Sequence, residues 1–284
     1  IEYEGEWKQC VRDGRGTEYF GNGQIAYQGE WKEGKPDGWG TNYSEDGRAW
    51  YEGEWKRGEK HGWGTKYAYY DHGELTWMPD DHISEYLLVS EYFVFADKRH
   101  IAYQGEWKQG KQDGNGARYY DNGKTLYEGE WKEGSPDGIG KWYFGNGETS
   151  YEGEWKEGFR DGNGTEYFSN GVEWRQGEWK YRESGKRGEQ CRYKGEWRCG
   201  MWHGHGTRYY DSGQVMYRGE WKQDEQDGNG TRYTRNGQMW YEGGLKQEKR
   251  DGWGTEYCDV DSIKYCGQWE GGYYHGYGTS FYPL

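Results

Sequence analysis

The chain contains few of the aliphatic residues that usually form a protein core. Leu, Ile, Val and Phe occur 6, 6, 6 and 7 times among 284 residues. Proline occurs only 4 times. No stretch approaches the roughly 18 consecutive apolar residues of a membrane-spanning helix. The composition therefore argues against a membrane span. It also argues against an α/β enzyme, whose buried strands and amphipathic helices are rich in aliphatic side chains.

A shortage of aliphatic residues combined with a net charge of −13 is typical of disordered proteins. The chain departs from that class because aromatic residues make up 20% of it, with 30 Tyr and 19 Trp. Disordered chains contain few aromatic residues. Together with the 52 Gly, the rings indicate a folded protein whose core is aromatic instead of aliphatic.

Two short motifs recur along almost the whole chain, 24 residues apart within each uninterrupted run. The first is Gly-Glu-Trp, usually with a Tyr two residues before the Gly. It begins at Gly5, Gly29, Gly53, Gly105, Gly129, Gly153, Gly177, Gly195 and Gly219, with variants at Gly243 and Gly267. The second is Asp/His-Gly-x-Gly, which begins at Asp13, Asp37, His61, Asp113, Asp137, Asp161, His203, Asp227, Asp251 and His275. Eleven units carry the first motif and ten carry both, which indicates a repeat protein.

Each unit is predicted to form two short strands. In Tyr27–Lys32 the apolar positions alternate with the period of a strand, and residues 37–43 form the second strand. Tight turns separate them, several with the Asn-Gly pair that favours hairpins, as at Asn22. Such short connections permit only antiparallel pairing. Gly38 and Gly40 are expected to leave one face bare, so that aromatic rings lie against the backbone.

These motifs resemble the MORN repeat (membrane occupation and recognition nexus). The family pattern Tyr-x-Gly-x-Trp/Phe-x-x-Gly-x-x-x-Gly-x-Gly is met by Tyr27–Gly40, Tyr127–Gly140 and Tyr151–Gly164. The resemblance implies an all-β fold, an elongated single-layer antiparallel β-meander solenoid of about eleven repeats. MORN repeats scaffold assemblies or bind partners, and any catalysis resides in another domain. The chain is therefore expected to be no enzyme and to hold no cofactor or metal.

The resemblance also implies a groove of aromatic rings and glycine that receives a helix or an extended segment of a partner protein. Tyr and Trp are enriched among the residues that contribute most to binding. The predicted groove anchors are Tyr27, Trp31, Tyr51, Trp55, Tyr103, Trp107, Tyr127, Trp131, Tyr151, Trp155, Tyr217 and Trp221.

The repeat pattern predicts a first array over residues 1–73, an interruption over 74–102 and a second array over 103–284 that is irregular at 180–192. The interruption holds nine of the 25 Leu, Ile, Val and Phe residues. One interpretation is a degenerate repeat that still pairs as a hairpin. The other is a partner-binding or self-association element, because local apolar enrichment marks interfaces. Its predicted interface residues are Leu87, Leu88, Phe93 and Phe95.

Residues 180–198 carry an excess of positive charge on an acidic chain. Lys186, Arg187, Arg192 and Lys194 are hereafter called the basic island. A solvated loop is one interpretation, and a site for an acidic partner or anionic lipid is the other. The five Cys show no zinc spacing, and a disulfide between Cys191 and Cys199, or between Cys258 and Cys266, stays open.

Taken together, the sequence favours a non-enzymatic scaffold of a larger assembly of cytoskeletal, ciliary or viral type. The expected location is the cytoplasm, in association with that assembly. A membrane or anionic-lipid tether is one alternative. Another is a regulatory repeat domain of an enzyme whose catalytic part is absent from this chain, which would then be a fragment. Nucleic acid is disfavoured by the negative charge. Self-association through edge strands near Tyr3 and Phe281 is the further expectation.

Overall fold

A computed structural model describes residues 2–71, 74–75, 99–168, 172–175, 178–181, 190–258 and 262–281. Two sets of predicted site residues lie outside these ranges. They are the four apolar residues of the interruption, Leu87, Leu88, Phe93 and Phe95, and two residues of the basic island, Lys186 and Arg187.

The chain divides into two compact units, Ile1–Ser135 and Pro136–Leu284. The strands of the first are β1 (Tyr3–Lys8), β2 (Val11–Tyr19), β3 (Ile25–Lys32), β4 (Lys35–Tyr43), β5 (Ala49–Lys56), β6 (Glu59–Asp71), β7 (Glu74–Leu75), β8 (Arg99–Lys108), β9 (Lys111–Tyr119) and β10 (Thr125–Lys132). Those of the second begin with β11 (Ser135–Tyr143), β12 (Thr149–Lys156), β13 (Phe159–Phe168), β14 (Val172–Arg175), β15 (Glu178–Tyr181) and β16 (Gln190–Arg198). They continue with β17 (Met201–Tyr209), β18 (Val215–Lys222), β19 (Glu225–Tyr233), β20 (Met239–Lys246), β21 (Lys249–Tyr257), β22 (Ile263–Glu270) and β23 (Tyr273–Ser280).

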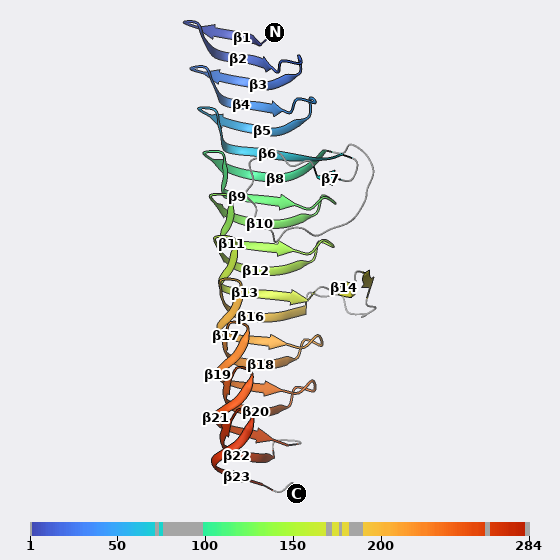
Figure 1. Cartoon of the computed structure of the whole chain (residues 1–284), viewed down its shortest axis with the longest axis vertical. Helices are drawn as coiled ribbons and strands as arrows, with labels where there is room; N and C mark the ends of the chain where they lie inside the picture. Colours follow the sequence, from blue (N-terminus) through green and yellow to red (C-terminus); the bar gives the residue numbers. More distant parts are fainter. Residues whose placement is uncertain are drawn as a thin grey trace. The chain divides into compact units, whose positions relative to one another are not determined.

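Each unit is an antiparallel β-meander, and the described residues contain no helix (Figure 1). Consecutive strands pair with each other, for example β3 with β4 and β4 with β5. Where the array is interrupted, β6 pairs directly with β8, and β13 pairs directly with β16. Strands β14 and β15 form a separate two-stranded sheet. The predicted all-β antiparallel meander is confirmed.

The register places the glycines of successive strands opposite each other. Gly29 pairs with Gly16 on one side and with Gly40 on the other. A row of facing glycines therefore crosses every repeat, and Tyr rings cover it. A methyl group added at Gly40 would overlap the Tyr27 hydroxyl. Glycine is required here because the ring and the backbone are already in contact.

The core of each unit is a ladder of Tyr and Trp rings on the face that carries these glycines, hereafter the ladder face. Tyr27 packs edge to face against Trp31 of its own repeat at 5.1 Å and against Trp55 of the next repeat at 5.5 Å. The Tyr27 hydroxyl donates to the Glu30 carbonyl at 3.2 Å, and Trp31 Nε1 donates to the Gly16 carbonyl at 3.2 Å. Edge-to-face packing is a favoured geometry of aromatic pairs, so the rings fill the place of the missing aliphatic core.

Gly38 has a different role from the one predicted. It does not leave the ladder face bare. Its φ is +110°, and an added methyl group would overlap the side chain of Glu30 on the opposite face. The repeat needs glycine here for the left-handed backbone conformation as well as for space. The alternation pattern missed this because it assumes regular strand geometry, whereas the register of β3 with β4 shifts between Gly29 and Trp31.

Candidate functional site

The twelve rings predicted as groove anchors lie in the core. Each Tyr among them is at most 2% exposed, and each Trp is at most 8% exposed. They share this place with Tyr193, Trp197, Tyr241 and Trp269. The prediction that a partner contacts these rings in the folded chain therefore needs correction, because neighbouring rings already cover them. What a partner would meet on the ladder face is the set of side chains around the rings.

Two positions of each repeat supply those surrounding side chains. Numbering every repeat from its first Tyr, they are position 10, just before the Asp or His, and position 16, two residues after the second glycine. An ion pair joins them in three repeats: Arg12 with Glu18 at 2.6 Å, Arg160 with Glu166 at 2.9 Å and Arg250 with Glu256 at 3.2 Å. In another repeat Arg232 Nε donates to the Gln226 amide oxygen at 2.7 Å. The two positions therefore face each other across the rings.

Positions 10, 16 and 24 give the ladder face a positive charge on a chain of net charge −13. In the first unit the cations at these positions are Arg12, Lys60, Lys66 and Arg118, against the carboxylates of Glu2 and Glu18. In the second unit they are Arg160, Arg192, Arg208, Arg232, Arg250 and Lys264, against Glu166 and Glu256. Several lie over aromatic rings. The Lys60 ammonium, for instance, is 4.5 Å from the Trp50 centroid and 5.0 Å from that of Trp107.

The structure separates the two described members of the basic island. Arg192 occupies position 24 and lies on the ladder face, where its guanidinium is 3.5 Å from Glu166. Lys194 follows Tyr193 by one residue and is exposed on the opposite face. Strand alternation divides them in this way. Arg192 and Lys194 thus do not belong to one patch, and Arg192 belongs to a longer row of cations that the sequence did not reveal.

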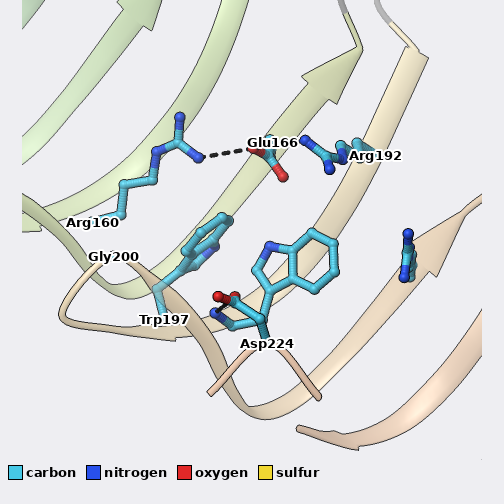
Figure 2. A pocket seen from close by; sticks show the side chains of 8 residues that line it. Arg160, Glu166, Arg192, Trp197, Gly200 and Asp224 are labelled. Carbon is cyan, nitrogen blue, oxygen red and sulfur yellow. Dashed lines mark hydrogen bonds and ion pairs between the residues drawn. The ribbon is translucent and has the colours of Figure 1, made fainter. Parts of the chain in front are cut away.

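The second unit contains a cavity of about 360 Å³ on its ladder face (Figure 2). The lining residues are Arg160, Glu166, Arg192, Trp197, Gly200, Trp202, Arg208 and Asp224. Trp202 forms a wall: its ring stacks on Tyr193 at 4.7 Å, and its backbone N–H donates to the Asp224 carboxylate at 2.7 Å. The guanidinium carbons of Arg192 and Arg208 lie 5.6 and 5.2 Å from the Trp202 centroid.

Three groups in this cavity have unmet bonding capacity. Glu166 Oε2 and Trp197 Nε1 are buried without a hydrogen-bond partner. Burial lowers the pKa of the Arg208 guanidinium, and the charge of Arg192 lowers it further. Within the described part of the chain the Arg208 guanidinium forms no hydrogen bond or ion pair, and the more distant charges of Glu248 and Glu166 only partly offset these effects on its pKa. Unsatisfied buried polar groups are rare in folded proteins, so this junction differs from the others in the array.

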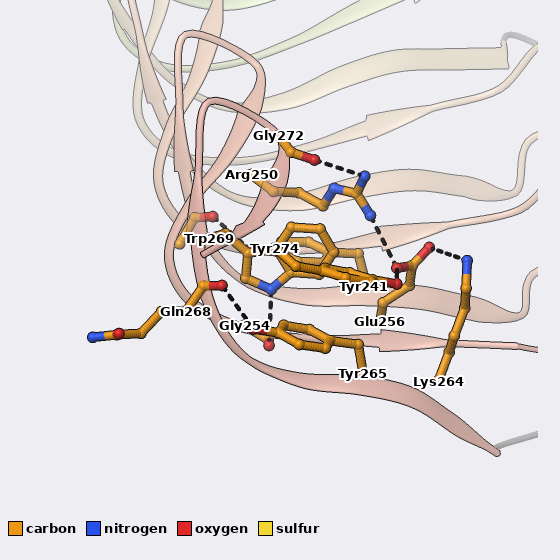
Figure 3. A network of polar contacts seen from close by, with 11 residues as sticks. Tyr241, Arg250, Gly254, Glu256, Lys264, Tyr265, Gln268, Trp269, Gly272 and Tyr274 are labelled. Carbon is orange, nitrogen blue, oxygen red and sulfur yellow. Dashed lines mark hydrogen bonds and ion pairs between the residues drawn. The ribbon is translucent and has the colours of Figure 1, made fainter. Parts of the chain in front are cut away.

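A second polar network lies near the end of the array (Figure 3). The Glu256 carboxylate accepts from Tyr274 at 2.7 Å and from Lys264 at 3.1 Å, and it pairs with Arg250 at 3.2 Å. Burial alone would raise the pKa of Glu256. The hydrogen bonds from Tyr274 and Lys264 and the charge of Arg250 outweigh it, so the pKa lies below its ordinary value. The charged groups of this network are paired with one another, so we assign the network a structural role.

The opposite face carries exposed apolar side chains at position 13, among them Trp39, Trp63, Ile139 and Trp253. A shallower depression of about 290 Å³ lies beside Trp63, where Ala117 takes the place that Thr has in most repeats. Among the described residues no group of His, Cys, Asp and Glu is placed to hold a metal. No described segment is a helix of sufficient length and apolar character to cross a bilayer.

The four cysteines whose side chains are described, Cys10, Cys199, Cys258 and Cys266, are free thiols. A bridge between Cys258 and Cys266 is therefore not formed. Strand β1 pairs with β2, and β23 pairs with β22. Self-association through β1 and β23 stays a prediction.

The fold and the glycine–aromatic ladder define a β-meander repeat protein without a helical layer in the described residues. The sequence model of the MORN repeat matches nine segments, residues 3–25, 27–47, 51–68, 103–125, 127–149, 151–173, 193–215, 217–239 and 265–283. The chain belongs to the MORN-repeat family. Comparison with curated proteins finds no match.

One repeat outside those segments keeps the same pairing in its described strands, β20 and β21. Residues 241–263 carry Gly244 and Leu245 where the motif has Glu and Trp. Strands β20 and β21 nevertheless pair, and Leu245 is 4% exposed at the place of the Trp ring. Strand register and side-chain burial are therefore the same as in the other repeats, although the motif residues differ.

Proposed function

We propose that this chain is a non-enzymatic interaction scaffold that binds an acidic segment of a partner protein along its ladder face. MORN repeats commonly mediate contacts with proteins or membranes. The observation that carries the proposal is the sign of the charge on the ladder face. In the second unit six cations face the three carboxylates of Glu166, Asp224 and Glu256 there, although the whole chain is strongly acidic.

The chemistry of these cations favours a peptide. Arg160 and Arg250 are largely covered, with 23% of each side chain exposed, and they lie over Tyr or Trp rings. A guanidinium held over a ring is oriented before a ligand arrives, which reduces the entropy lost on binding. A flat lipid surface reaches protruding cations best, whereas a narrow acidic segment can follow a row of half-buried ones.

Binding is tested with a fluorescently labelled 20-residue glutamate-rich peptide, followed by anisotropy at several salt concentrations. We expect binding that weakens as salt rises, because exposed charges are screened, and no binding of a lysine-rich peptide of equal length. The ladder-face variant combines Arg192→Glu with Lys264→Glu, whose side chains are 44% and 52% exposed. It should bind about tenfold more weakly.

The matched control combines Lys194→Glu with Arg218→Glu, both exposed on the opposite face. It changes the net charge by the same amount, so it should keep affinity within about twofold. Equal losses in the two variants would show that overall charge, not the ladder face, drives binding. Vesicles containing phosphatidylserine form a third arm of the experiment. If the peptide binds weakly and the vesicles displace it, the result would favour the lipid-tether alternative instead.

The cytoskeletal, ciliary or viral setting of such a scaffold is part of the same proposal. It is supported only by the repeat class and the charged face. Copurification under low-salt conditions, compared between wild type and the two variants, tests it: the partner must be acidic where it binds and must be lost from the ladder-face variant alone.

A further inference from the structure

One junction in the second unit departs from the repeat at three positions that come together in space. Arg192 stands at position 24, where other repeats have mostly apolar residues or Ser. Trp202 occupies position 10, and Asp224 occupies position 8, which is Gly in most repeats. All three line the cavity of about 360 Å³ described above. Because several residues of the repeat pattern are replaced around one cavity, we interpret the cavity as a binding site and not as random variation among repeats.

The replacements fix two guanidinium groups beside one ring. Trp202 is held from two sides, by stacking on Tyr193 and by its backbone bond to Asp224. Arg192 and Arg208 lie within 6 Å of its centroid. Glu166 Oε1 accepts from Arg160 at 2.9 Å and pairs with Arg192 at 3.5 Å, but Glu166 forms no ion pair with Arg208. Arg208 is therefore held in place by its cation–π contact and forms no ion pair among the described residues, although the charges of Glu166 and Glu248 act on it from farther away.

The junction also loses a bond that other repeats keep. Trp155 Nε1 donates to the Gly140 carbonyl and Trp221 Nε1 to the Gly206 carbonyl, each at 3.2 Å. The equivalent Trp197 Nε1 is buried without an acceptor, and Trp197 is 5% exposed. A buried donor without a partner is unfavourable in the free chain. Its neighbour Glu166 Oε2 is a buried acceptor in the same condition.

We propose that this cavity binds one carboxylate of the acidic partner segment, which rests on the proposed function above. Three arginines face two carboxylates, Glu166 and Asp224, so a single negative charge neutralises the cavity. A planar carboxylate matches the fork of an arginine. Its oxygens accept from Arg208 and Trp197, and a backbone N–H of the same peptide donates to Glu166 Oε2. A phosphate dianion would add repulsion against Glu166.

The first test compares substitutions with the glutamate-rich peptide. Arg208→Gln should weaken binding about tenfold, because it removes the unpaired guanidinium. Arg232→Gln, one repeat further on, removes the same charge from a guanidinium already bonded to Gln226, so its effect should be about threefold or less. Arg218→Gln on the opposite face serves as the neutral control. Circular dichroism establishes that each variant is folded.

The second test observes the cavity itself. In protein labelled with ¹⁵N-tryptophan, the indole N–H resonance of Trp197, assigned with Trp197→Phe, should shift on addition of a peptide of alternating Glu and Gly. The matched peptides replace Glu by Gln or by phosphoserine. The Gln peptide should leave the resonance unchanged, and the phosphoserine peptide should bind more weakly than the Glu peptide.

The outcomes separate the two proposals. Suppose that the glutamate-rich peptide binds the wild-type chain. If Arg208→Gln and Arg232→Gln then weaken binding equally, or the Trp197 resonance does not move, the cavity proposal is overturned and the ladder-face function stands. Tighter binding of phosphoserine overturns the carboxylate assignment. If no acidic peptide binds the wild-type chain, both proposals are overturned.

Discussion

At the scale of the residue, each ring of the ladder depends on glycines on two strands. The Tyr51 hydroxyl donates to the Glu54 carbonyl at 3.1 Å, so the ring must lie flat along the backbone. Its path crosses Gly53 of the same strand and Gly64 of the next, and a methyl group at Gly64 would overlap the hydroxyl. Tyr51 is fully buried as a result. The Tyr and the glycines are thus one packing unit, although they stand at separate positions of the repeat.

Gly40→Ala should destabilise the chain by about 3 kcal/mol, because the added methyl group overlaps the Tyr27 ring and must displace it. Chemical denaturation followed by tryptophan fluorescence measures the change. Gly21→Ala is the control, since nothing lies within 4 Å of the added methyl group and its φ is not positive. A loss of similar size in both variants would contradict the role of the ring.

Glu256→Gln should remove stability at neutral pH and leave little difference in acid. The folded-state pKa of Glu256 lies below its ordinary value of about 4.3. Its contribution is therefore present above pH 4.3 and is lost as pH falls through the folded pKa. We expect the variant to be about 1 to 3 kcal/mol less stable at pH 7. Denaturant unfolding at pH 7, 4 and 3 measures both proteins, and a difference that stays constant with pH would contradict the prediction.

At the scale of the element, a hydrogen bond to an aspartate links most repeats to the next. The backbone N–H of Arg57 donates to the Asp37 carboxylate at 3.2 Å, and the N–H of Glu157 donates to Asp137 at 3.1 Å. The donor residue has a positive φ, +53° at Arg57, which turns its N–H toward the carboxylate. His61 and His203 take the place of this Asp, as His275 does in the last repeat, and no such bond is formed at His61 or His203 among the described residues. Histidine is therefore not equivalent to aspartate there.

His61→Asp should stabilise the first unit by about 0.5 to 1 kcal/mol by creating the missing bond. The N–H that would donate belongs to Gln109, whose φ of +51° matches that of the bonded residues in other repeats. Thermal unfolding in parallel with wild type measures the gain. Asp37→Ala, which deletes an existing bond, should change stability in the opposite direction. An unchanged or lower stability of His61→Asp would show that the strand ends at this junction differ from the other repeats.

At the scale of the whole molecule, the burial of many tyrosines couples stability to alkaline pH. Burial raises the pKa of Tyr51, Tyr103, Tyr193 and their equivalents well above the ordinary value, and that of Tyr241 to about 12. A raised folded-state pKa contributes stability that is complete below the unfolded pKa of about 10 and is lost as pH rises above it. Because burial raises the pKa of Tyr27, Tyr151 and Tyr217 in the same way, the losses add up.

The chain should therefore unfold steeply above about pH 10, with tyrosinate absorbance and loss of β circular dichroism appearing together. After rapid mixing to pH 11.5, the tyrosinate absorbance of the ladder rings should appear at the rate at which the β circular dichroism signal is lost. Complete ionisation of the rings while the sheet signal persists would contradict the burial of the ladder.

The sequence by itself determined the repeat length, the strand pairs, the antiparallel order and the aromatic core. All four follow from local rules, since alternation sets the face of each side chain and the Asn-Gly and Gly-rich turns permit only hairpins. Burial and charge distribution were decided by the tertiary structure alone. Tyr27 loses its exposure through Trp55 of the next repeat, and the ladder-face cations come together only when positions 10, 16 and 24 of neighbouring strands meet. The cavity at Trp202 is the clearest case, because Arg160, Arg192, Arg208 and Asp224 are far apart in the chain and are brought to one place by strand pairing.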